Sequence, residues 1–472
     1  MPFKPELHGV IPMKITKNLL AQVMLLSAVN LLSLPVFAET DSDGDGVVDS
    51  IDVDDDNDGL IELYTLHDLS LMSFDYTGSS LKSSAEDPGS TEGCSYTGED
   101  GLSEPACTGY ELMADVDFDT NANGMIDMGD EFCNYSETRA VCEGWIPVYL
   151  YADFTGNGHR ISNLYIDRPD DFYIGFFSKF SSHKLSNVEF SGALTSVTGG
   201  YYVGIAVGSS INDSRLSGIR TEGTVTAYSK SGGIAGGISS GKLSASSSKA
   251  HVISTNPTST SGSGGIVGSV WGDGIVETSF SEGKVHAVYA GGITGNLDGY
   301  AILRNSFSVA DVMGEYFAGG LTGNMRAGST IENSLALGVV AGGDYYRAGL
   351  GGLIGFVDTD TQYLPLLKIA VTHSHWATDT TQQSKPYGNE LEPRDQLEFY
   401  RASSSEPATL SELECPEQAS EGGCASDIRL YIGWDESLWD FGTSNQLPGL
   451  NLAGTVYRPV QTMDGSFDVV TE

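Results

Sequence analysis

The sequence predicts an all-β protein built from stacked repeats, and three observations support this. Glycine accounts for 59 of the 472 residues, about 12%, against about 7% in ordinary chains. A glycine-rich phrase returns at intervals of 27 to 32 residues, and the residues between its copies alternate apolar with small or polar side chains, as strands do. One unit of this length cannot bury its own apolar face but a stack of units can, so we expect a solenoid.

The glycine phrase has five clear copies and two degenerate ones. The clear copies are GGIAGGI, GGIVGSV, GGITGNL, GGLTGNM and GGLIGFV, which begin at Gly232, Gly264, Gly291, Gly319 and Gly351. The degenerate copies, YIGFFSKF from Tyr173 and YYVGIAVGS from Tyr201, come before them. A second phrase lies between the copies, as in LRNSFSVADVMG from Leu303. Glycine permits corners with positive φ and a close approach of neighbouring units, so we expect both uses here.

The first phrase resembles the GLUG motif of bacterial secreted and surface proteins, which is named for its glycine–leucine–any–glycine core. The resemblance implies a right-handed parallel β-helix in which each repeat supplies one coil. The segment GLIELYTLHDLSLMS from Gly59 resembles the opening coils that precede such repeats, and WDFGTSNQLPGL from Trp439 resembles the phrase that closes them. The resemblance therefore covers most of residues 59–450.

An Asp-rich stretch, residues 41–62, precedes the repeats. It holds ten carboxylates in 22 residues and no Lys or Arg. These negative charges repel one another unless a cation neutralises them. Acidic residues at alternate positions, followed by glycine, match the EF-hand-type calcium loop. Two copies occur here, and a third, DTNANGMIDMGD, begins at Asp119.

The three loops predict a set of oxygen ligands, which favours calcium over magnesium. The expected side-chain ligands are Asp41, Asp43, Asp45, Asp49 and Asp52; Asp54, Asp56, Asp58 and Glu62; and Asp119, Asn121, Asn123, Asp127 and Asp130, with backbone carbonyls from Val47, Leu60 and Met125. Position 12 of the second loop is Thr65, so its closing carboxylate is missing or comes from a neighbour. The pattern also resembles thrombospondin type-3 repeats, although the cysteine between such repeats is absent. The alternative is a solvated acidic linker.

The first 38 residues have the layout of a bacterial secretory signal peptide. From Met13 the chain places Lys14 and Lys17 before an apolar run, and Val36-Phe37-Ala38 before Glu39. Met13 is an alternative start. No later segment has 18 uninterrupted apolar residues, so we expect no transmembrane segment. A net charge of −39 disfavours nucleic-acid partners and anionic membranes. We expect the protein to be secreted or on the outer cell surface.

Six cysteines form three pairs of neighbours in the sequence. The pairs are Cys94 with Cys107, Cys133 with Cys142, and Cys415 with Cys424. Six cysteines allow 15 pairings, and locality alone favours these three. In an oxidising compartment we expect disulfides that staple the two caps of the solenoid. Zinc is the competing interpretation, but no C-x-x-C spacing occurs.

These features divide the chain into five parts. Residues 1–38 are the signal peptide and residues 39–62 the calcium-binding segment; residues 63–170 hold the N-terminal cap, the first coils and the third calcium loop; residues 171–380 are the GLUG-type repeats; and residues 381–472 form the last coils, a cap and a tail.

Aromatic residues recur at equivalent places in the repeats. Phe172, Tyr201, Tyr289 and Phe317 would stack into a broken ladder in adjacent coils. An outward ladder would be a platform for sugar rings or a protein partner. An inward ladder would be core packing, which is the favoured alternative because aromatic stacks inside solenoids need no ligand.

The fold does not choose between a structural rod and an enzyme. We expect an adhesive or extracellular-matrix role, with an extracellular polysaccharide or a cell-surface protein as partner; self-association stays open. The alternative is a polysaccharide lyase or glycoside hydrolase, which needs a carboxylate cluster. The best candidate is DRPDD, with Asp167, Asp170 and Asp171 beside Arg168. We expect this segment to be an acidic turn between coils, and we assign no catalytic residue.

Overall fold

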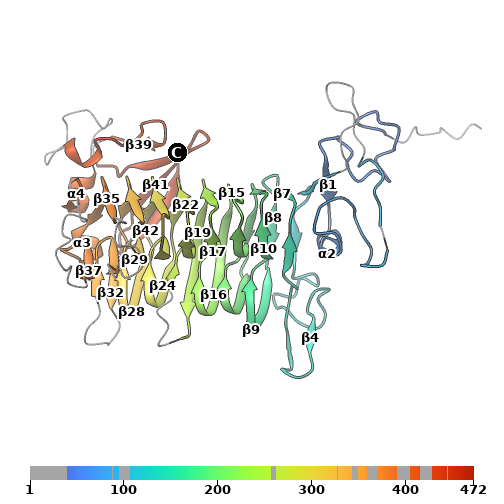
Figure 1. The fold of residues 1–472 in the computed structure, drawn as a ribbon, viewed down its shortest axis with the longest axis horizontal. Helices are drawn as coiled ribbons and strands as arrows, with labels where there is room; N and C mark the ends of the chain where they lie inside the picture. The colour runs from blue at the N-terminus through green and yellow to red at the C-terminus, as the bar shows by residue number, and fades with distance from the viewer. Residues whose placement is uncertain are drawn as a thin grey trace, which may run out of the picture.

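A computed structural model of the chain is a parallel β-solenoid of about eight turns (Figure 1). The structure describes residues 40–472 except 88, 95–106, 257–261, 327, 343–348, 359–368, 391–403, 415–427 and 444, and without the side chains of 389 and 390. The expected signal peptide and the Cys415–Cys424 pair lie outside the described residues. The predicted all-β solenoid is confirmed.

Three parallel sheets form the sides of the solenoid. The first has ten strands: β1 (Leu60–Leu63), β2 (Gly109–Leu112), β7 (Asp153–Thr155), β11 (Lys184–Ser186), β15 (Arg215–Ser217), β18 (Lys242–Ser244), β22 (Ile275–Glu277), β26 (Ile302–Arg304), β30 (Thr330–Glu332) and β35 (Ala370–Thr372). The second has nine: β6 (Val148–Leu150), β10 (Phe177–Ser181), β14 (Val207–Ile211), β17 (Ala235–Ser239), β21 (Val267–Trp271), β25 (Thr294–Leu297), β29 (Thr322–Arg326), β34 (Ile354–Asp358) and β37 (Tyr387–Glu390).

The third side contributes one or more strands per coil. Its 17 strands are β3 (Val116–Asp117), β8 (Arg160–Ser162), β9 (Tyr165–Ile174), β12 (Glu189–Ser191), β13 (Ser196–Val203), β16 (Arg220–Ser231), β19 (Ser247–Ser254), β20 (Gly262–Gly264), β23 (Phe280–Ser281), β24 (Lys284–Gly291), β27 (Phe307–Ser308), β28 (Asp311–Gly319), β31 (Leu335–Ala336), β32 (Val340–Gly342), β33 (Gly349–Gly351), β36 (His375–Ala377) and β38 (Pro407–Ala408). The few helical segments are short: α2 (Leu66–Leu71), α3 (Thr378–Thr381), α4 (Leu410–Leu413) and the 3-10 helix η2 (Ile428–Tyr431).

The first glycines of the five phrases stack on one another. Gly264 pairs with Gly291, Gly291 with Gly319, and Gly319 with Gly351, while Gly232 forms a bridge with Gly264. A Cβ at Gly291 would lie 2.0 Å from the carbonyl oxygen of Thr294, so no larger residue fits. These five glycines do not have positive φ, and the expectation of positive φ is wrong for them. Their role is the close approach of the backbone.

The apolar residue of each glycine phrase fills the core. Ile234, Ile266, Ile293, Leu321 and Leu353 are fully buried. The amide of each of the first four donates to the carbonyl of the next, at 2.8 to 3.0 Å. The repeat in the sequence is therefore a ladder of identical positions along the solenoid axis.

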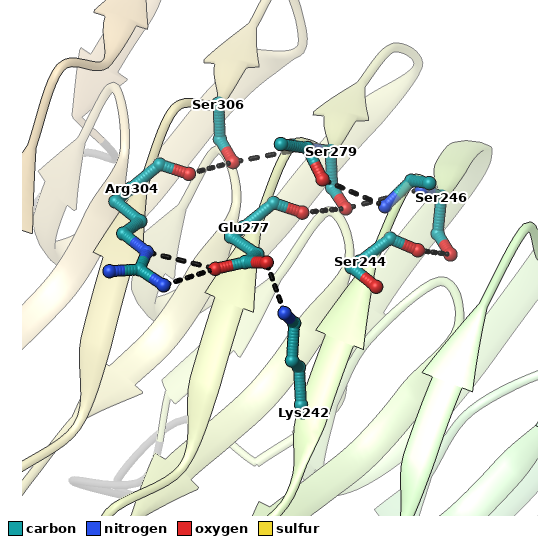
Figure 2. Close-up of polar contacts among 9 residues, drawn as sticks. Lys242, Ser244, Ser246, Glu277, Ser279, Arg304 and Ser306 are labelled. Carbon is teal, nitrogen blue, oxygen red and sulfur yellow. Dashed lines mark hydrogen bonds and ion pairs between the residues drawn. The ribbon is translucent and has the colours of Figure 1, made fainter. Parts of the chain in front are cut away.

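A chain of serines marks the corner that the second phrase supplies (Figure 2). The Ser279 hydroxyl accepts a hydrogen bond from the Ser246 amide at 3.2 Å, and the Ser306 hydroxyl accepts one from the Ser279 amide at 3.2 Å. Each hydroxyl donates to the carbonyl two residues earlier, as Ser306 does to Arg304 at 2.8 Å. The residue before each serine turns the corner with positive φ, as Asn305 does at 48°. Asparagine tolerates this conformation better than most residues.

An ion-pair ladder runs beside the serines. The Glu277 carboxylate lies between Lys242 of the preceding coil and Arg304 of the following coil, with Arg304 Nε at 2.8 Å (Figure 2). Burial alone would raise the pKa of Glu277, but the hydrogen bonds from Lys242 and Arg304 hold it below its usual value. The ladder ties three successive coils together on this side.

Both ends of the solenoid carry additional structure. At the N-terminal end the Cys94–Cys107 disulfide lies next to β2, and Cys133–Cys142 closes a hairpin of β4 (Tyr135–Ser136) and β5 (Val141–Cys142). These two predicted disulfides are confirmed. At the other end an antiparallel sheet folds back along the flank of the solenoid (Figure 1); its strands are β39 (Trp439–Asp440), β40 (Gly449–Leu452), β41 (Thr455–Gln461) and β42 (Phe467–Thr471).

The C-terminal sheet covers an outward-facing apolar strip. Phe280, Phe307 and Leu335 are in register on adjacent coils. They share one buried cluster with Trp434 and Trp439. The end of the chain therefore acts as a cover for the third side as well as a cap.

Replacing Ser306 with alanine should destabilise the solenoid. The Ser279 amide would lose its partner inside a buried corner, which costs about 1–3 kcal/mol. Chemical denaturation followed by circular dichroism measures the loss. The matched control is Ser182→Ala, at an exposed serine; equal losses in the two variants would contradict the proposed role of the serine chain.

Candidate metal centre and ligand face

The second Asp-rich loop has the backbone of a cation-binding loop. The Asp54 carboxylate accepts hydrogen bonds from the amides of Asp58 and Gly59, both at 3.0 Å. The Asp58 carboxylate accepts one from the Leu60 amide at 2.8 Å. Gly59 has φ of 85°, which favours glycine at this position. One oxygen each from Asp54, Asp56 and Asp58 lies within 4.8 Å of the other two.

A second group of carboxylates lies where this loop meets the solenoid. Parallel pairing of β1 with β2 places Glu62 opposite Glu111. Oxygens of Asp56, Glu62 and Glu111 lie within 4.8 Å of one another. Glu62 is 5% exposed and Glu111 is 4% exposed. Sequence reasoning missed Glu111, whose only signal is a single carboxylate inside the apolar stretch GYELM.

Burial makes the charged form of these carboxylates unfavourable. Burial is the main cause that raises the pKa of Asp54 to about 7 and that of Glu62 to about 9. Hydrogen bonding with Asp55 and the negative charges of Asp55 and Glu111 add to the effect on Glu62. Burial also raises the pKa of Glu111. A bound divalent cation would reverse this balance by supplying the missing positive charge.

The first loop brings together only part of its expected ligand set. Oxygens of Asp41, Asp43 and Asp45 lie within 4.8 Å of one another. Asp49 instead accepts hydrogen bonds from the amide and hydroxyl of Ser42, at 2.8 and 2.9 Å. Asp52 accepts one from the Asp54 amide at 2.8 Å, next to the second loop.

In the third loop the acidic side chains accept hydrogen bonds from groups of the same loop. Asp119 accepts hydrogen bonds from the amides of Asn123 and Gly124, at 3.1 and 2.9 Å, as Asp54 does from Asp58 and Gly59 in the second loop. The side-chain amides of Asn121 and Asn123 both donate to Asp127, at 3.2 and 2.9 Å.

Asp130 closes the third loop, and all three loops share one backbone contact. Asp130 accepts hydrogen bonds from the Thr120 hydroxyl and from the amides of Asn121 and Asp127. The amide at position 7 donates to the side chain at position 5 in all three loops. These amides belong to Val47, Leu60 and Met125. The backbone pattern is therefore shared, but three buried carboxylates, those of Asp54, Glu62 and Glu111, gather at the second loop.

The aromatic ladder lies on the outside of the solenoid. Phe172 is 59% exposed and stacks on Tyr201, with ring centroids 5.1 Å apart and an interplanar angle of 7°. Tyr289 and Phe317 are partly exposed, with centroids 4.9 Å apart. Tyr228 extends the first group at 5.2 Å from Tyr201. The outward alternative holds for these rings, and core packing does not describe them.

A second row of rings lies beside Phe172 and Tyr201. Tyr173 stacks on Tyr202 at 5.2 Å. The ammonium groups of Lys179 and Lys230 lie 4.2 and 4.5 Å from the centroids of Tyr173 and Tyr202. The face thus combines flat aromatic surface with positive charge, in a strongly acidic protein.

The DRPDD segment lies in strand β9, so the expectation of a turn is wrong. Asp167 pairs with Arg139 of the β4–β5 hairpin at 2.6 Å. Arg168 lies 3.3 Å from Glu143 and 3.8 Å from Asp171. These ion pairs attach the hairpin to the coil.

A groove of about 610 Å³ lies on the side of the third loop. Its lining includes Asp117, Arg160, Glu189 and Glu222. Glu189 accepts hydrogen bonds from Arg160 at 2.9 Å and from the Ser191 hydroxyl at 2.8 Å. Asp117 accepts one from the Asn163 side-chain amide at 2.8 Å. Two of its acids are thus already held by structural partners.

Comparisons with known proteins give one relative and one solved structure. No family model matches the chain. The chain is 33% identical to halomucin of Haloquadratum walsbyi over 179 residues, which are 38% of this chain; the chain spans about 2% of the length of halomucin. A candidate immunoglobulin A1 protease from Bacteroides ovatus has a TM-score of 0.43 and 16% identity, over 82% of this chain and 91% of that one. Among the described residues no helix is long and apolar enough to cross a membrane.

Replacing Phe172 with alanine should have little effect on stability, under about 1 kcal/mol, because its ring is mostly exposed. Phe307→Ala is the matched comparison; it empties a fully buried site and should cost about 3–5 kcal/mol. Chemical denaturation measures both. Similar losses would mean that Phe172 belongs to the packed core.

Proposed function

We propose that this chain is an extracellular calcium-binding β-solenoid that serves as an adhesive or structural rod. The observation that carries the proposal is the convergence of buried carboxylates where the Asp-rich segment meets the first coils. Such groups are costly to bury unless a cation is bound. The solenoid itself supplies a long, regular surface for a partner.

The second loop fits a hard cation best. Asp54 is fully buried, and its side chain converges with those of Asp56 and Asp58. An oxygen-only donor set of this kind suits calcium. Asp41, Asp43 and Asp45 would hold a second ion at the first loop. Each bound ion would cancel two of the negative charges that otherwise repel along residues 41–62.

Two observations and two expectations support a location outside the cell. The two disulfides suit an oxidising compartment. Calcium-dependent order suits a calcium-rich exterior. The relative that matches part of the chain is called a halomucin, a name that denotes a mucin. The secretory layout of residues 1–38 points the same way.

The outer aromatic face is the proposed ligand platform. Stacked, partly exposed rings such as Phe172 and Tyr201 can hold flat sugar faces or apolar groups of a protein. The lysines over Tyr173 and Tyr202 favour a polysaccharide that carries acidic groups. Polysaccharide cleavage gains no support from DRPDD, because Asp167 and Asp171 are engaged in ion pairs.

Calcium should order residues 40–62 in the chain from Glu39 onward. Bound ions neutralise the carboxylates, so backbone amides of this segment should exchange hydrogen more slowly in calcium than in chelator. Hydrogen exchange read by mass spectrometry measures this, with residues 262–342 as the internal reference. The same exchange rates in both conditions would contradict calcium binding.

Removing the ladder should weaken adhesion. In the Phe172→Ala/Tyr201→Ala variant two stacking rings are lost, which are worth about 0.5–1.5 kcal/mol each, so binding to immobilised acidic polysaccharide should fall about 5- to 150-fold. Tyr300→Ala is the control, since Tyr300 is also 59% exposed but lies outside the stacked rings. Unchanged affinity in the double variant would exclude this face as the platform.

A further inference from the structure

Thr65, at position 12 of the second loop, caps a helix and does not face a cation site with a carboxylate. The hydroxyl of Thr65 accepts a hydrogen bond from the Asp68 amide at 3.2 Å, and the Asp68 carboxylate accepts one from the Thr65 amide at 2.9 Å. This capping box starts helix α2. The side chain of Thr65 is therefore committed to the helix, and the loop has to obtain its last carboxylate elsewhere.

The register of the first coil brings that carboxylate from a distant part of the sequence. Because β1 and β2 run parallel, Glu62 and Glu111 lie side by side. In an ordinary sheet two adjacent buried carboxylates repel, and one would expect a Lys or Arg between them. Here the side chain that converges with Glu62 and Glu111 is another carboxylate, that of Asp56.

Glu111 carries a free oxygen in this buried place. The Asn157 side-chain amide donates to Oε2 of Glu111 at 2.5 Å and so fixes the carboxylate. The other oxygen, Oε1, is buried and has no hydrogen-bond partner. With Glu111 only 4% exposed, this orphaned acceptor points to a bound cation, independently of the number of acids nearby.

We propose that Asp56, Glu62 and Glu111 bind a divalent cation, calcium by its donor atoms, next to the ion that the second loop holds. Asp56 belongs to both carboxylate groups and would contact both ions. This inference rests on the proposed calcium binding of the loop. It adds a site that joins two separate parts of the chain: the loop and β1 on one side, and the first coil at β2 on the other.

A cation at this place links calcium binding to the docking of the loop. The site exists only when β1 is paired with β2, so calcium stabilises the paired state and the paired state raises calcium affinity. The Asp-rich segment then closes the first edge of the solenoid only where calcium is present. An edge that is left open would be available for pairing with another chain.

The test is a calcium titration by isothermal titration calorimetry of the chain from Glu39 onward and of Glu111→Gln. Glutamine keeps the shape of the side chain and can still accept the hydrogen bond from Asn157. The variant should bind one calcium ion fewer, or bind one ion at least about tenfold more weakly. Mutation of residues that only hydrogen-bond to metal ligands already lowers metal affinity by about tenfold or more. Glu62→Gln should give the same loss, and Glu436→Gln, at an exposed glutamate, should give none.

Thermal melting in chelator separates this role from a purely structural one. Without calcium, Glu111→Gln removes a repulsion and should melt no lower than the wild-type chain; with calcium it should gain less than the wild type. Calcium binding that is identical in the wild-type chain and in both variants would overturn the inference and leave the proposed function intact. A wild-type chain that binds no calcium would overturn both.

Discussion

The parallel stacking of coils in one fixed register is the constraint on which the rest of this molecule depends. The five stacked glycines leave room only for backbone, so successive coils meet at one spacing. Buried apolar residues such as Ile293 and Leu321 then repeat along the axis and form the core. At one corner the serine hydroxyls accept hydrogen bonds from buried backbone amides, which would otherwise have no partner. A one-residue slip would break all three ladders at once.

The same register that builds the solenoid also assembles its polar sites. Glu277 meets Arg304 because the two residues occupy one position of adjacent coils, and Lys242 reaches Glu277 from the preceding coil, where it lies opposite Ile275. Phe172 stacks on Tyr201 for the same reason. Glu62 and Glu111 are brought together in the same way, but there two buried carboxyl groups meet. The proposed cation turns this unfavourable pair into the link between the acidic segment and the rod.

Much of the fold could be predicted from the sequence, because the repeat is local. The spacing of the glycine phrases and their alternating pattern indicate strands and stacking without knowledge of any contact. The role of the individual glycines was harder, since positive φ at the corner is taken by residues such as Asn305 and Thr278. Two contacts depend on long-range register and could not be predicted: Glu111 beside Glu62, and the C-terminal sheet over Phe307. The outward direction of the aromatic ladder could not be predicted for the same reason, and the expectation of core packing was wrong.

The proposed calcium ions would lie where the Asp-rich segment meets the solenoid. The anomalous scattering of calcium, in crystals of the chain from Glu39 onward grown with calcium, can locate them. We expect an anomalous peak at the second loop, about 2.3–2.6 Å from oxygens of Asp54, Asp56 and Asp58. Ordered carboxylates at these positions with no anomalous peak between them, in crystals saturated with calcium, would contradict the proposed calcium binding.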